Sequence, residues 1–333
     1  MDLADCTTLR LGGPARSVVD ARTDDELVDA ARDPGALLLA GGSNVVVADE
    51  GVDGTVVRVL TRGVRAEEEP DGVLLRVAAG EPWDDLVARC VADGLAGIEC
   101  LAGIPGSVGA TPIQNVGAYG QEVAETIVAV RVLDRRSGEV MELGPPDCGF
   151  GYRTSRFKRE PGRWVVLEVA LRLARGTDGA PIRYAELART LGLEPGGRAP
   201  LADVRDVVLA LRRGKGMVLD PGDHDTWSAG SFFTNPFVDP AALPEGAPAF
   251  AGTDGTVKTS AAWLIERAGF RRGYGDPHGI AISSKHALAL TNRGAGTTAG
   301  LVALAREIAG GVAERFAVRL EPEPVFIGVA WIG

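Results

Sequence analysis

The pattern of apolar and polar positions predicts a chain in which short strands alternate with amphipathic helices. Thr23 and Glu26 have the spacing of a capping box, which predicts a short helix that ends at about Ala31. Pro82 suits the first turn of a helix through about Asp93, because the apolar residues of this segment fall on one face. The same patterns predict further helices at 184–191, 201–213, 259–268 and 298–316, strands at 36–40, 45–47, 56–60, 73–79, 127–133, 164–173, 287–291 and within 317–332, and a surface insertion at 239–252.

Length, composition and charge indicate a folded protein of two or three domains. The chain has 333 residues, 45% of them hydrophobic, which is ordinary for a globular protein. Its 35 basic and 45 acidic side chains give a net charge of −10, which argues against nucleic acid or a membrane as the main partner. The four cysteines and three histidines show no metal-binding spacing, so we expect no metal site. Without an apolar leader or a run of about 18 apolar residues, we expect a cytoplasmic protein.

Glycine is unusually frequent, with 45 residues, and it gathers in clusters between apolar runs. One cluster is the turn 41–44, which lies between two predicted strands and so does not start a Rossmann unit. Another is the long loop 94–120. Glycine-lined backbone can cradle a pyrophosphate through its N–H groups, although tight structural turns would show the same composition. The joint occurrence of both clusters in an acidic chain favours a dinucleotide cofactor, whereas the similar cluster at 294–300 fits a helix N-cap better.

Three smaller features carry candidate chemistry. Ser231 stands between a glycine and two phenylalanines, where it is either a turn residue or a proton donor. Glu321 and Glu323 alternate with prolines near the end of the chain, which is a pattern of solvated acids or of a functional pair. The only lysines are Lys158, Lys215, Lys258 and Lys285, and a flexible ammonium group suits phosphate binding.

Taken together, these blocks resemble the UDP-N-acetylenolpyruvoylglucosamine reductases, flavoenzymes of peptidoglycan precursor synthesis. The resemblance runs in order from about Thr8 to Gly328 and rests on LRLGGPA, LLLAGGSN, GLAGIECLAGIPGSVGATPIQNVGAYGQEV, GYRTSRFK, AGSFFTNP, SAAWLIERAGF, SSKHALALTN and EPEPVFIG. It implies an α+β fold: an FAD-binding fold of the vanillyl-alcohol-oxidase (PCMH) type with a C-terminal α+β substrate-binding domain. It further implies a first FAD-binding subdomain at 1–60, joined by the segment 320–333, a second at 61–216, and a substrate-binding domain at 217–319.

The resemblance also implies a reaction. Hydride passes from NADPH to non-covalently bound FAD, and then to the enolpyruvyl ether of a UDP sugar, which gives UDP-N-acetylmuramate. Ser231 matches the proton donor, Arg153 would neutralise the developing enolate, and Glu323 would polarise the carboxylate region or carry a proton. The partners implied are the sugar nucleotide and NADPH, with no nucleic acid and no membrane, and the protein is expected to be a monomer.

Further positions are matched to binding roles by the resemblance. The FAD-binding positions are Gly41, Gly42, Ser43, Asn44, Gly103, Pro105, Gly106, Ser107, Gly109, Ala110, Asn115, Gly117 and Arg212. The substrate-binding positions are Tyr184, Lys215, Asn235, Lys285 and His286. Two alternatives stay open at this point: an FAD-dependent oxidoreductase of the same fold with a different substrate, and an inactive sugar-nucleotide-binding homologue.

Overall fold

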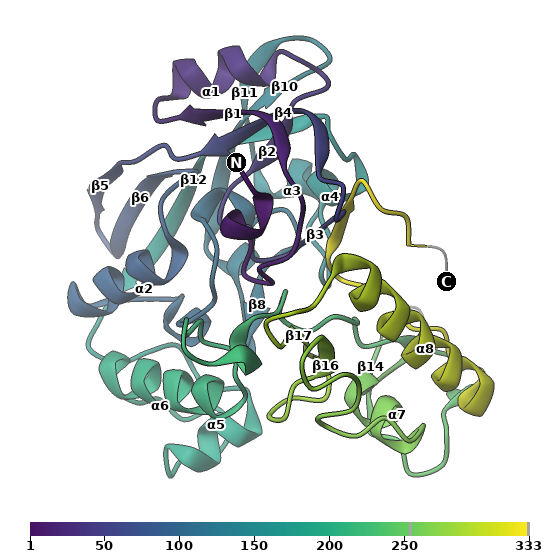
Figure 1. Cartoon of the computed structure of the whole chain (residues 1–333). Coiled ribbons are helices and arrows are strands. Elements are labelled where there is room, and N and C mark those ends of the chain that lie inside the picture. The colour runs from purple at the N-terminus through teal and green to yellow at the C-terminus, as the bar shows by residue number, and fades with distance from the viewer. Residues whose placement is uncertain (253–254, 332–333) are drawn as a thin grey trace. The chain divides into compact units, whose positions relative to one another are not determined.

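A computed structural model describes residues 1–252 and 255–331 of the chain, which form two compact units (Figure 1). Unit 1 contains residues 1–15, 42–53 and 214–333, and unit 2 contains residues 16–41 and 54–213. Each unit is therefore assembled from segments that are far apart in the sequence. The predicted division into 1–60 with 320–333, 61–216 and 217–319 stays a prediction, and its residues 253–254 and 332–333 lie outside the described part.

Unit 2 is built on a six-stranded antiparallel sheet with the order β11-β10-β12-β6-β5, in which β7 pairs with the end of β12. A three-stranded sheet, β1-β4-β2, also belongs mainly to this unit, and its strands β2 and β4 are parallel. β12 lies at the centre of the large sheet and is buried along most of its length, which matches its nearly continuous apolar sequence. The strands of unit 2 are β1 (Ala15–Ala21), β2 (Leu37–Leu39), β4 (Val52–Val59), β5 (Val64–Glu69), β6 (Gly72–Ala78), β7 (Leu95–Ala96), β8 (Gly117–Ala118), β9 (Gln121–Glu122), β10 (Ile127–Asp134), β11 (Glu139–Leu143) and β12 (Trp164–Arg175).

The helices of unit 2 follow the sequence signals closely. Helix α1 (Asp24–Ala31) begins with the predicted capping box, in which the Thr23 hydroxyl accepts from the Glu26 N–H. Helix α2 (Trp83–Ala92) buries its predicted apolar stripe. The remaining helices are α3 (Pro145–Cys148), α4 (Arg156–Arg159), α5 (Ala185–Thr190) and α6 (Leu201–Gly214), the last of which ends at the first residue of unit 1. The strongest periodicities in the sequence therefore became helices at the predicted places.

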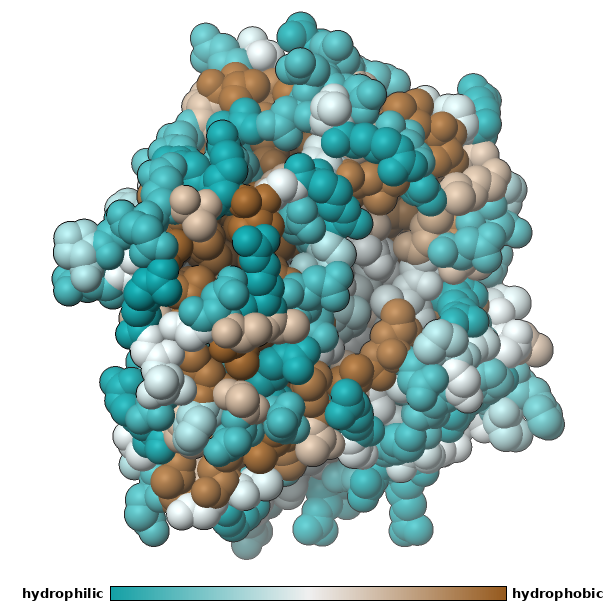
Figure 2. Space-filling view, turned by 90° about the vertical axis from the view of Figure 1, so that its left-hand side faces the viewer, coloured by the Kyte–Doolittle hydropathy of each residue, from teal (hydrophilic) through white to brown (hydrophobic). Residues whose placement is uncertain are grey.

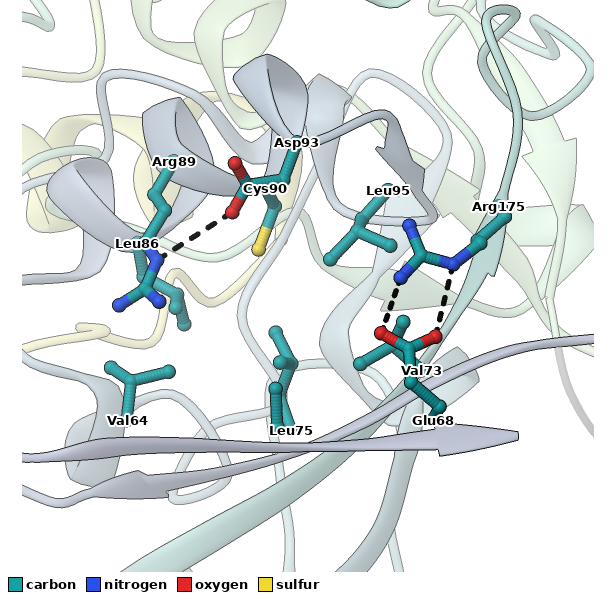
Figure 3. Close-up of a pocket in the computed structure, with 11 residues that line it drawn as sticks. Val64, Glu68, Val73, Leu75, Leu86, Arg89, Cys90, Asp93, Leu95 and Arg175 are labelled. Atoms are coloured by element: carbon teal, nitrogen blue, oxygen red, sulfur yellow. Dashed lines mark hydrogen bonds and ion pairs between the residues drawn. The ribbon is translucent and has the colours of Figure 1, made fainter.

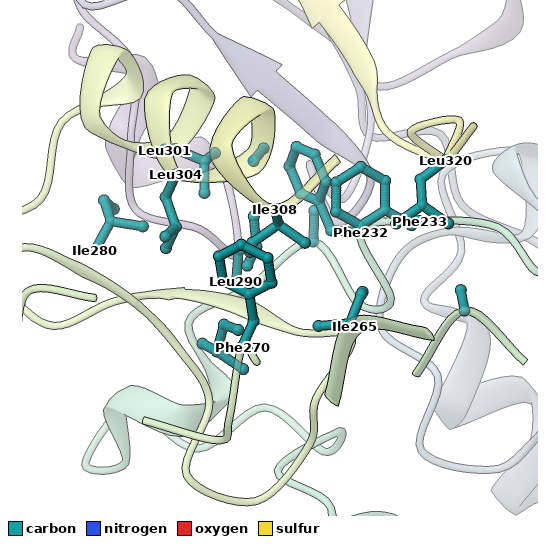
Figure 4. Packing of buried hydrophobic residues seen from close by; sticks show 14 of the residues in the cluster. Phe232, Phe233, Ile265, Phe270, Ile280, Leu290, Leu301, Leu304, Ile308 and Leu320 are labelled. Atoms are coloured by element: carbon teal, nitrogen blue, oxygen red, sulfur yellow. The ribbon is translucent and has the colours of Figure 1, made fainter. Parts of the chain in front are cut away.

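Unit 1 is built around helix α8 (Thr298–Phe316), which packs with α7 (Ala261–Arg267) and with the β16-β17 hairpin. Figure 4 shows its core, a cluster of buried side chains that includes Phe232, Phe233, Leu301 and Ile308. The final strand pairs in parallel with a strand of the N-terminal region, since Val325 lies opposite Val45. The strands of unit 1 are β3 (Val45–Val47), β13 (Phe237–Val238), β14 (Ala249–Ala251), β15 (Val257–Thr259), β16 (Ile280–Ile282), β17 (Leu290–Asn292) and β18 (Val325–Ile327).

Among the described residues, no helix is long and apolar enough to cross a membrane. No group of three or more His, Cys, Asp or Glu in the same part of the chain is arranged to hold a metal ion.

Candidate functional site

The turn at Gly41 lies against the glycine loop of unit 2. A Cβ atom on Gly41 would come within 2.6 Å of the Gly106 Cα, so a larger residue would force the two segments apart. The N–H groups of Gly41, Gly106 and Ser107 donate to no protein acceptor within the described residues. Such N–H groups on closely packed backbone are suited to bind an anionic group.

Ser107 has an unsatisfied hydroxyl next to this close approach of Gly41 and Gly106. The residue is 5% exposed, and its Oγ is buried without a hydrogen-bond partner in the described part of the chain. A buried hydroxyl without a partner costs free energy, so its presence favours a ligand atom that completes the hydrogen bond. The loop itself is rigidly held, because the Gly103 N–H donates to Asp84 Oδ1 at 2.6 Å and the Gly109 N–H donates to the Ala79 carbonyl oxygen at 2.8 Å.

Arg153 is brought onto the far end of the same loop. Its Nη2 donates to the Gly117 carbonyl oxygen at 2.6 Å, and its own carbonyl oxygen accepts from Lys158 Nζ at 3.2 Å. Arg153, Asn115 and Tyr119 all have positive φ angles of 47–52°, which are costly for residues other than glycine. Strained backbone of this kind tends to gather at functional sites, and here it gathers around the segment that the sequence singled out.

Asn115 and Arg212 fix the two ends of the loop. Asn115 is 1% exposed, and its amide nitrogen donates to Glu122 Oε2 at 2.7 Å and to the Gly151 carbonyl oxygen at 3.1 Å. Arg212, in the last turn of α6, donates to the Gly103 carbonyl oxygen at 3.3 Å. The residue as a whole is half-buried, but its Nε is shielded from water. Desolvation lowers the pKa of this guanidinium, while Tyr119 and Asp84 act in the opposite direction.

Tyr184 projects from the N-cap of α5 and is 42% exposed. Its ring makes an edge contact with Tyr119, with centroids 5.4 Å apart. Tyr184 was predicted from the sequence, whereas Tyr119 was not, although its place between Gly117 and Gly120 of the long loop was a signal. Glu99, a fully buried acid in the same loop, was not predicted either.

In unit 1 the structure brings Ser231, Glu323 and Asn44 onto neighbouring segments. The segment after Ser231 forms a bridge with the end of the chain, since Phe233 lies opposite Pro322 and the Glu323 N–H donates to the Phe232 carbonyl oxygen at 2.8 Å. The Asn44 side-chain amide donates to the Glu323 carbonyl oxygen at 3.4 Å. Phe232 and Phe233 are each 1% exposed and belong to the core, so the segment that follows Ser231 is fixed.

The other predicted positions of unit 1 make contacts of different kinds. The Asn235 Oδ1 accepts from the Ala261 N–H at 3.0 Å, so it supports the start of α7. Lys285 forms a short ion pair with Asp223, which raises the pKa of its ammonium group. His286 Nδ1 accepts from the Leu288 N–H at 2.9 Å, and Lys215 is half-buried. Of the further FAD-binding positions, Gly42, Ser43 and Asn44 belong to unit 1, and Pro105, Ala110 and Gly117 belong to unit 2.

The glycine cluster at 294–300 is not arranged as an anion site. Thr297 caps α8, as its hydroxyl accepts from the Gly300 N–H at 3.0 Å. Asp49 occupies the N-terminus of the same helix, because its carboxylate accepts from the N–H groups of Thr298 at 2.7 Å and Ala299 at 2.9 Å. The interpretation of this cluster as a capped helix start is confirmed.

A cavity of about 290 Å³ lies elsewhere in unit 2, between α2 and the β5–β6 edge of the large sheet (Figure 3). Apolar and charged side chains line it together, and the charged ones form ion pairs between Arg175 and Glu68 and between Arg89 and Asp93. On the face of the molecule turned toward the viewer in Figure 2, apolar residues gather in patches among hydrophilic ones. None of the predicted site residues lines this cavity.

The three buried cysteines are not reactive thiols. Cys90, Cys100 and Cys148 are buried, and burial raises the pKa of all three thiols, in the case of Cys90 to about 12. A thiol with such a pKa is protonated at neutral pH and is a poor nucleophile. Cys100, which lies in the glycine loop, is therefore a small apolar filler of the core.

Comparison with known proteins decides which family these features belong to. Two family models match: an FAD binding domain over residues 15–144, and the C-terminal domain of UDP-N-acetylenolpyruvoylglucosamine reductase over residues 220–327. The UDP-N-acetylenolpyruvoylglucosamine reductase of Streptomyces coelicolor is 58% identical over 98% of this chain and 89% of its own. That of Salinispora arenicola is 57% identical over 97% of this chain and 94% of its own. The chain belongs to the UDP-N-acetylenolpyruvoylglucosamine reductase family.

A solved structure of the reductase family supports the fold as well. The crystal structure of the UDP-N-acetylenolpyruvylglucosamine reductase from Thermus caldophilus matches 98% of this chain and 97% of its own length, with a TM-score of 0.68 and 28% identity. The family and the fold class predicted from the sequence, an FAD-binding fold with a C-terminal α+β domain, are thereby confirmed.

Proposed function

We infer that this protein catalyses the NADPH-dependent reduction of UDP-N-acetylglucosamine enolpyruvate to UDP-N-acetylmuramate through bound FAD, a step of peptidoglycan precursor synthesis. The observation that carries this inference is identity of 57–58% to reductases of this name over nearly the whole chain, together with the match to an FAD binding domain. Identity at this level spans both units, so it covers the cofactor-binding and the substrate-binding parts alike.

The glycine turns of unit 2 fit the pyrophosphate of FAD. Gly41 and Gly106 allow their two backbone segments to approach where a side chain would not fit. The buried Ser107 hydroxyl has no hydrogen-bond partner among the described residues, so it is available to a ligand oxygen. The residues proposed to hold FAD are Gly41, Gly103, Pro105, Gly106, Ser107, Gly109, Ala110, Asn115, Gly117 and Arg212 of unit 2, and Gly42, Ser43 and Asn44 of unit 1. FAD supplies the hydride-transfer chemistry that amino-acid side chains lack.

The proposed roles of the side chains follow from the charge that develops in the substrate. When hydride adds to the methylene carbon of the enolpyruvyl group, negative charge spreads over the neighbouring carbon and the carboxylate. Arg153 is proposed to neutralise this charge, and the Ser231 hydroxyl to deliver a proton to the carbon. Glu323 is proposed to support this proton transfer, while its neighbour Glu321 pairs with Arg319 at 2.9 Å on the surface.

Binding of the sugar nucleotide is proposed for Tyr184 in unit 2 and for Lys215, Asn235, Lys285 and His286 in unit 1. Lys215 and Lys285 carry the positive charge that a diphosphate requires. Lys285 pairs with Asp223, so it would exchange this partner for a phosphate oxygen. We also propose a cytoplasmic location and a monomeric state, in keeping with soluble nucleotide substrates.

Anaerobic absorbance spectroscopy tests this function directly. The purified protein is loaded with FAD, NADPH is added, and UDP-N-acetylglucosamine enolpyruvate follows. We expect the visible absorbance of the oxidised flavin to disappear when NADPH is added and to return when the enolpyruvyl nucleotide is added. A band that bleaches but does not return would exclude this substrate and indicate a related oxidoreductase. A protein that takes up no FAD would exclude a flavoenzyme altogether.

A further inference from the structure

Glu99 is a buried carboxylate to which none of the proposed roles assigns a task. It lies in the 3-10 turn Glu99–Leu101 of unit 2, four residues before Gly103, and it is 0% exposed. Acidic side chains are almost never fully buried unless their charge is compensated. In the described part of the chain, however, no lysine or arginine forms an ion pair with Glu99.

The compensation comes from three N–H donors on three separate segments. The Gly97 N–H donates to Glu99 Oε2 at 2.6 Å, and the Gln121 side-chain amide donates to Oε1 at 2.9 Å. The Ala180 N–H also donates to Oε1, at 2.7 Å. Oε1 thus accepts two hydrogen bonds and Oε2 accepts one, so both oxygens of the buried side chain are satisfied by these partners.

The two segments that Glu99 joins to its own are held closely. The side-chain oxygen Oε1 of Gln121 accepts from the Cys100 N–H at 2.9 Å, so the Gln121 amide is bonded to two adjacent residues, Glu99 and Cys100. At Gly179, a Cβ atom would come within 2.8 Å of Glu99 Oε1, so the backbone beside Ala180 packs directly on the carboxylate. Glu99 and its partners thus form a cross-link inside unit 2.

The two distant segments that are bonded to Glu99 also carry the Tyr119–Tyr184 pair. Tyr119 precedes Gln121 by two residues, and Tyr184 follows Ala180 by four. The two rings meet edge to face, 5.4 Å apart. A Cβ atom on Gly120 would come within 3.1 Å of the Arg183 Cβ. The segment from Tyr119 to Gln121 and the segment from Ala180 to Tyr184 therefore also pack closely at these two residues.

We propose that Glu99 is a positioning residue that fixes Tyr184, through Gln121 and Ala180, relative to the glycine loop that starts at Gly103. Glu99 touches neither substrate nor cofactor in this role, and its effect reaches the reaction only through the placement of the tyrosine pair. The inference rests on the proposed function, because Tyr184 is proposed there to bind the sugar nucleotide.

Glu99→Gln tests the proposal in the FAD-loaded full-length protein. The amide keeps the size of the side chain but offers one acceptor oxygen, so at least one of the three N–H donors faces an NH₂ group. We expect the KM for UDP-N-acetylglucosamine enolpyruvate to rise about tenfold, which corresponds to about 1.4 kcal/mol, with kcat and the Kd for FAD within about twofold of the wild type. Glu139→Gln, the same change at an exposed residue of β11, is the matched control and should alter none of these three constants.

A double-mutant cycle with Tyr184→Ala separates positioning from a general loss of structure. If Glu99 acts through Tyr184, the two single changes raise KM by similar factors, and the double variant is hardly worse than Tyr184→Ala alone. Effects on KM that multiply in the double variant would overturn the proposal. A fall in kcat by the same factor as the rise in KM would also overturn it. An unchanged KM in Glu99→Gln would overturn it as well.

A second variant keeps the test decisive if Glu99→Gln does not fold. Gln121→Met removes one donor and leaves Glu99 with its two backbone partners, so we expect a smaller rise that is still confined to KM. No change in KM for this variant would count against the proposal. A wild-type protein that does not turn over the enolpyruvyl nucleotide would instead refute the proposed function, which the variants do not address.

Discussion

At the scale of single residues, Ser231 shows how the surrounding structure prepares a small side chain for a task. Its two phenylalanine neighbours are fixed in the core, and the bridge from Phe233 to Pro322 fixes the segment that follows. Ser231→Ala removes only the hydroxyl from this rigid support. We therefore expect flavin reduction by NADPH to be unchanged and the reoxidation by the enolpyruvyl nucleotide to slow by about 10²–10⁴-fold, measured by stopped-flow absorbance.

The control for this experiment is Ser228→Ala, three residues upstream. The Ser228 hydroxyl accepts from the Gly230 N–H at 3.2 Å and has a structural role, so its loss should leave the second half-reaction nearly as fast as in the wild type. If Ser231→Ala reoxidises at the wild-type rate, the serine is not the proton donor.

The sequence could identify candidate residues but could not sort similar ones. Glu321 and Glu323 are each followed by a proline, yet Glu321 is exposed and paired with Arg319, whereas the backbone of Glu323 is bonded to both Asn44 and Phe232. These partners lie about 280 and 90 positions away along the chain, and no local pattern reveals them. Glu99 was overlooked for the same reason, because two of its three donors, on Gln121 and Ala180, come from distant segments.

At the scale of elements, the predictions succeeded where one residue pattern sufficed to determine the element. Helix α8 was predicted at 298–316 and is found there, since its period and its Thr297 cap agree. Strand β5 was missed because its sequence VRAEEE is charged, as befits an edge strand that must avoid pairing with other chains. A strand was expected within the terminal region 317–332, and β18 (Val325–Ile327) forms there, just after Pro322 and Pro324, which cannot donate to a ladder.

Two adjacent glycines of α8 give a matched prediction at this scale. A Cβ atom on Gly310 would meet no other atom within 4 Å, whereas one on Gly311 would come within 2.6 Å of the Phe270 ring. We expect Gly310→Ala to raise the free energy of unfolding by about 0.5–1 kcal/mol, because alanine restricts the unfolded chain and favours the helix. Gly311→Ala should lower it by about 1–3 kcal/mol through overpacking.

Urea unfolding followed by circular dichroism measures both changes against the wild type. The two variants carry the same helix-propensity gain, so their difference isolates the contact with Phe270. Similar stabilities for the two variants would mean that α8 and the Phe270 ring do not pack as the structure has them.

At the scale of the whole molecule, both units hold carboxylates in their charged form. In unit 2, a hydrogen bond from Arg163 lowers the pKa of Asp134 below its ordinary value of 3.8. In unit 1, burial raises the pKa of Asp225, but hydrogen bonds from Ser284 and the charge of Arg293 outweigh this effect and lower it. Asp134 and Asp225 are only 5% and 7% exposed at their side chains, so water screens them little. The pairs of Glu68 and Glu69 with arginines are more exposed and should matter less.

These lowered pKa values predict how stability depends on pH. A carboxyl whose pKa is lower in the folded protein binds its proton more readily in the unfolded chain, so it stabilises the fold above the unfolded pKa. That contribution is lost as the pH falls through the folded pKa. We therefore expect the free energy of unfolding to change little with these groups between pH 6 and 8, and to fall steeply below about pH 4.

Asp134→Asn should make this fall shallower while it lowers stability at pH 7, because the amide cannot titrate and leaves Arg163 with only Glu160 as a charged partner. Urea unfolding at a series of pH values measures both effects. Glu68→Gln changes a more exposed pair on the same sheet and should leave the pH profile almost unchanged. The acid sensitivity would have another origin if both variants kept the wild-type slope. Equal flattening by both would mean that exposed ion pairs contribute as much as buried ones, contrary to the screening argument.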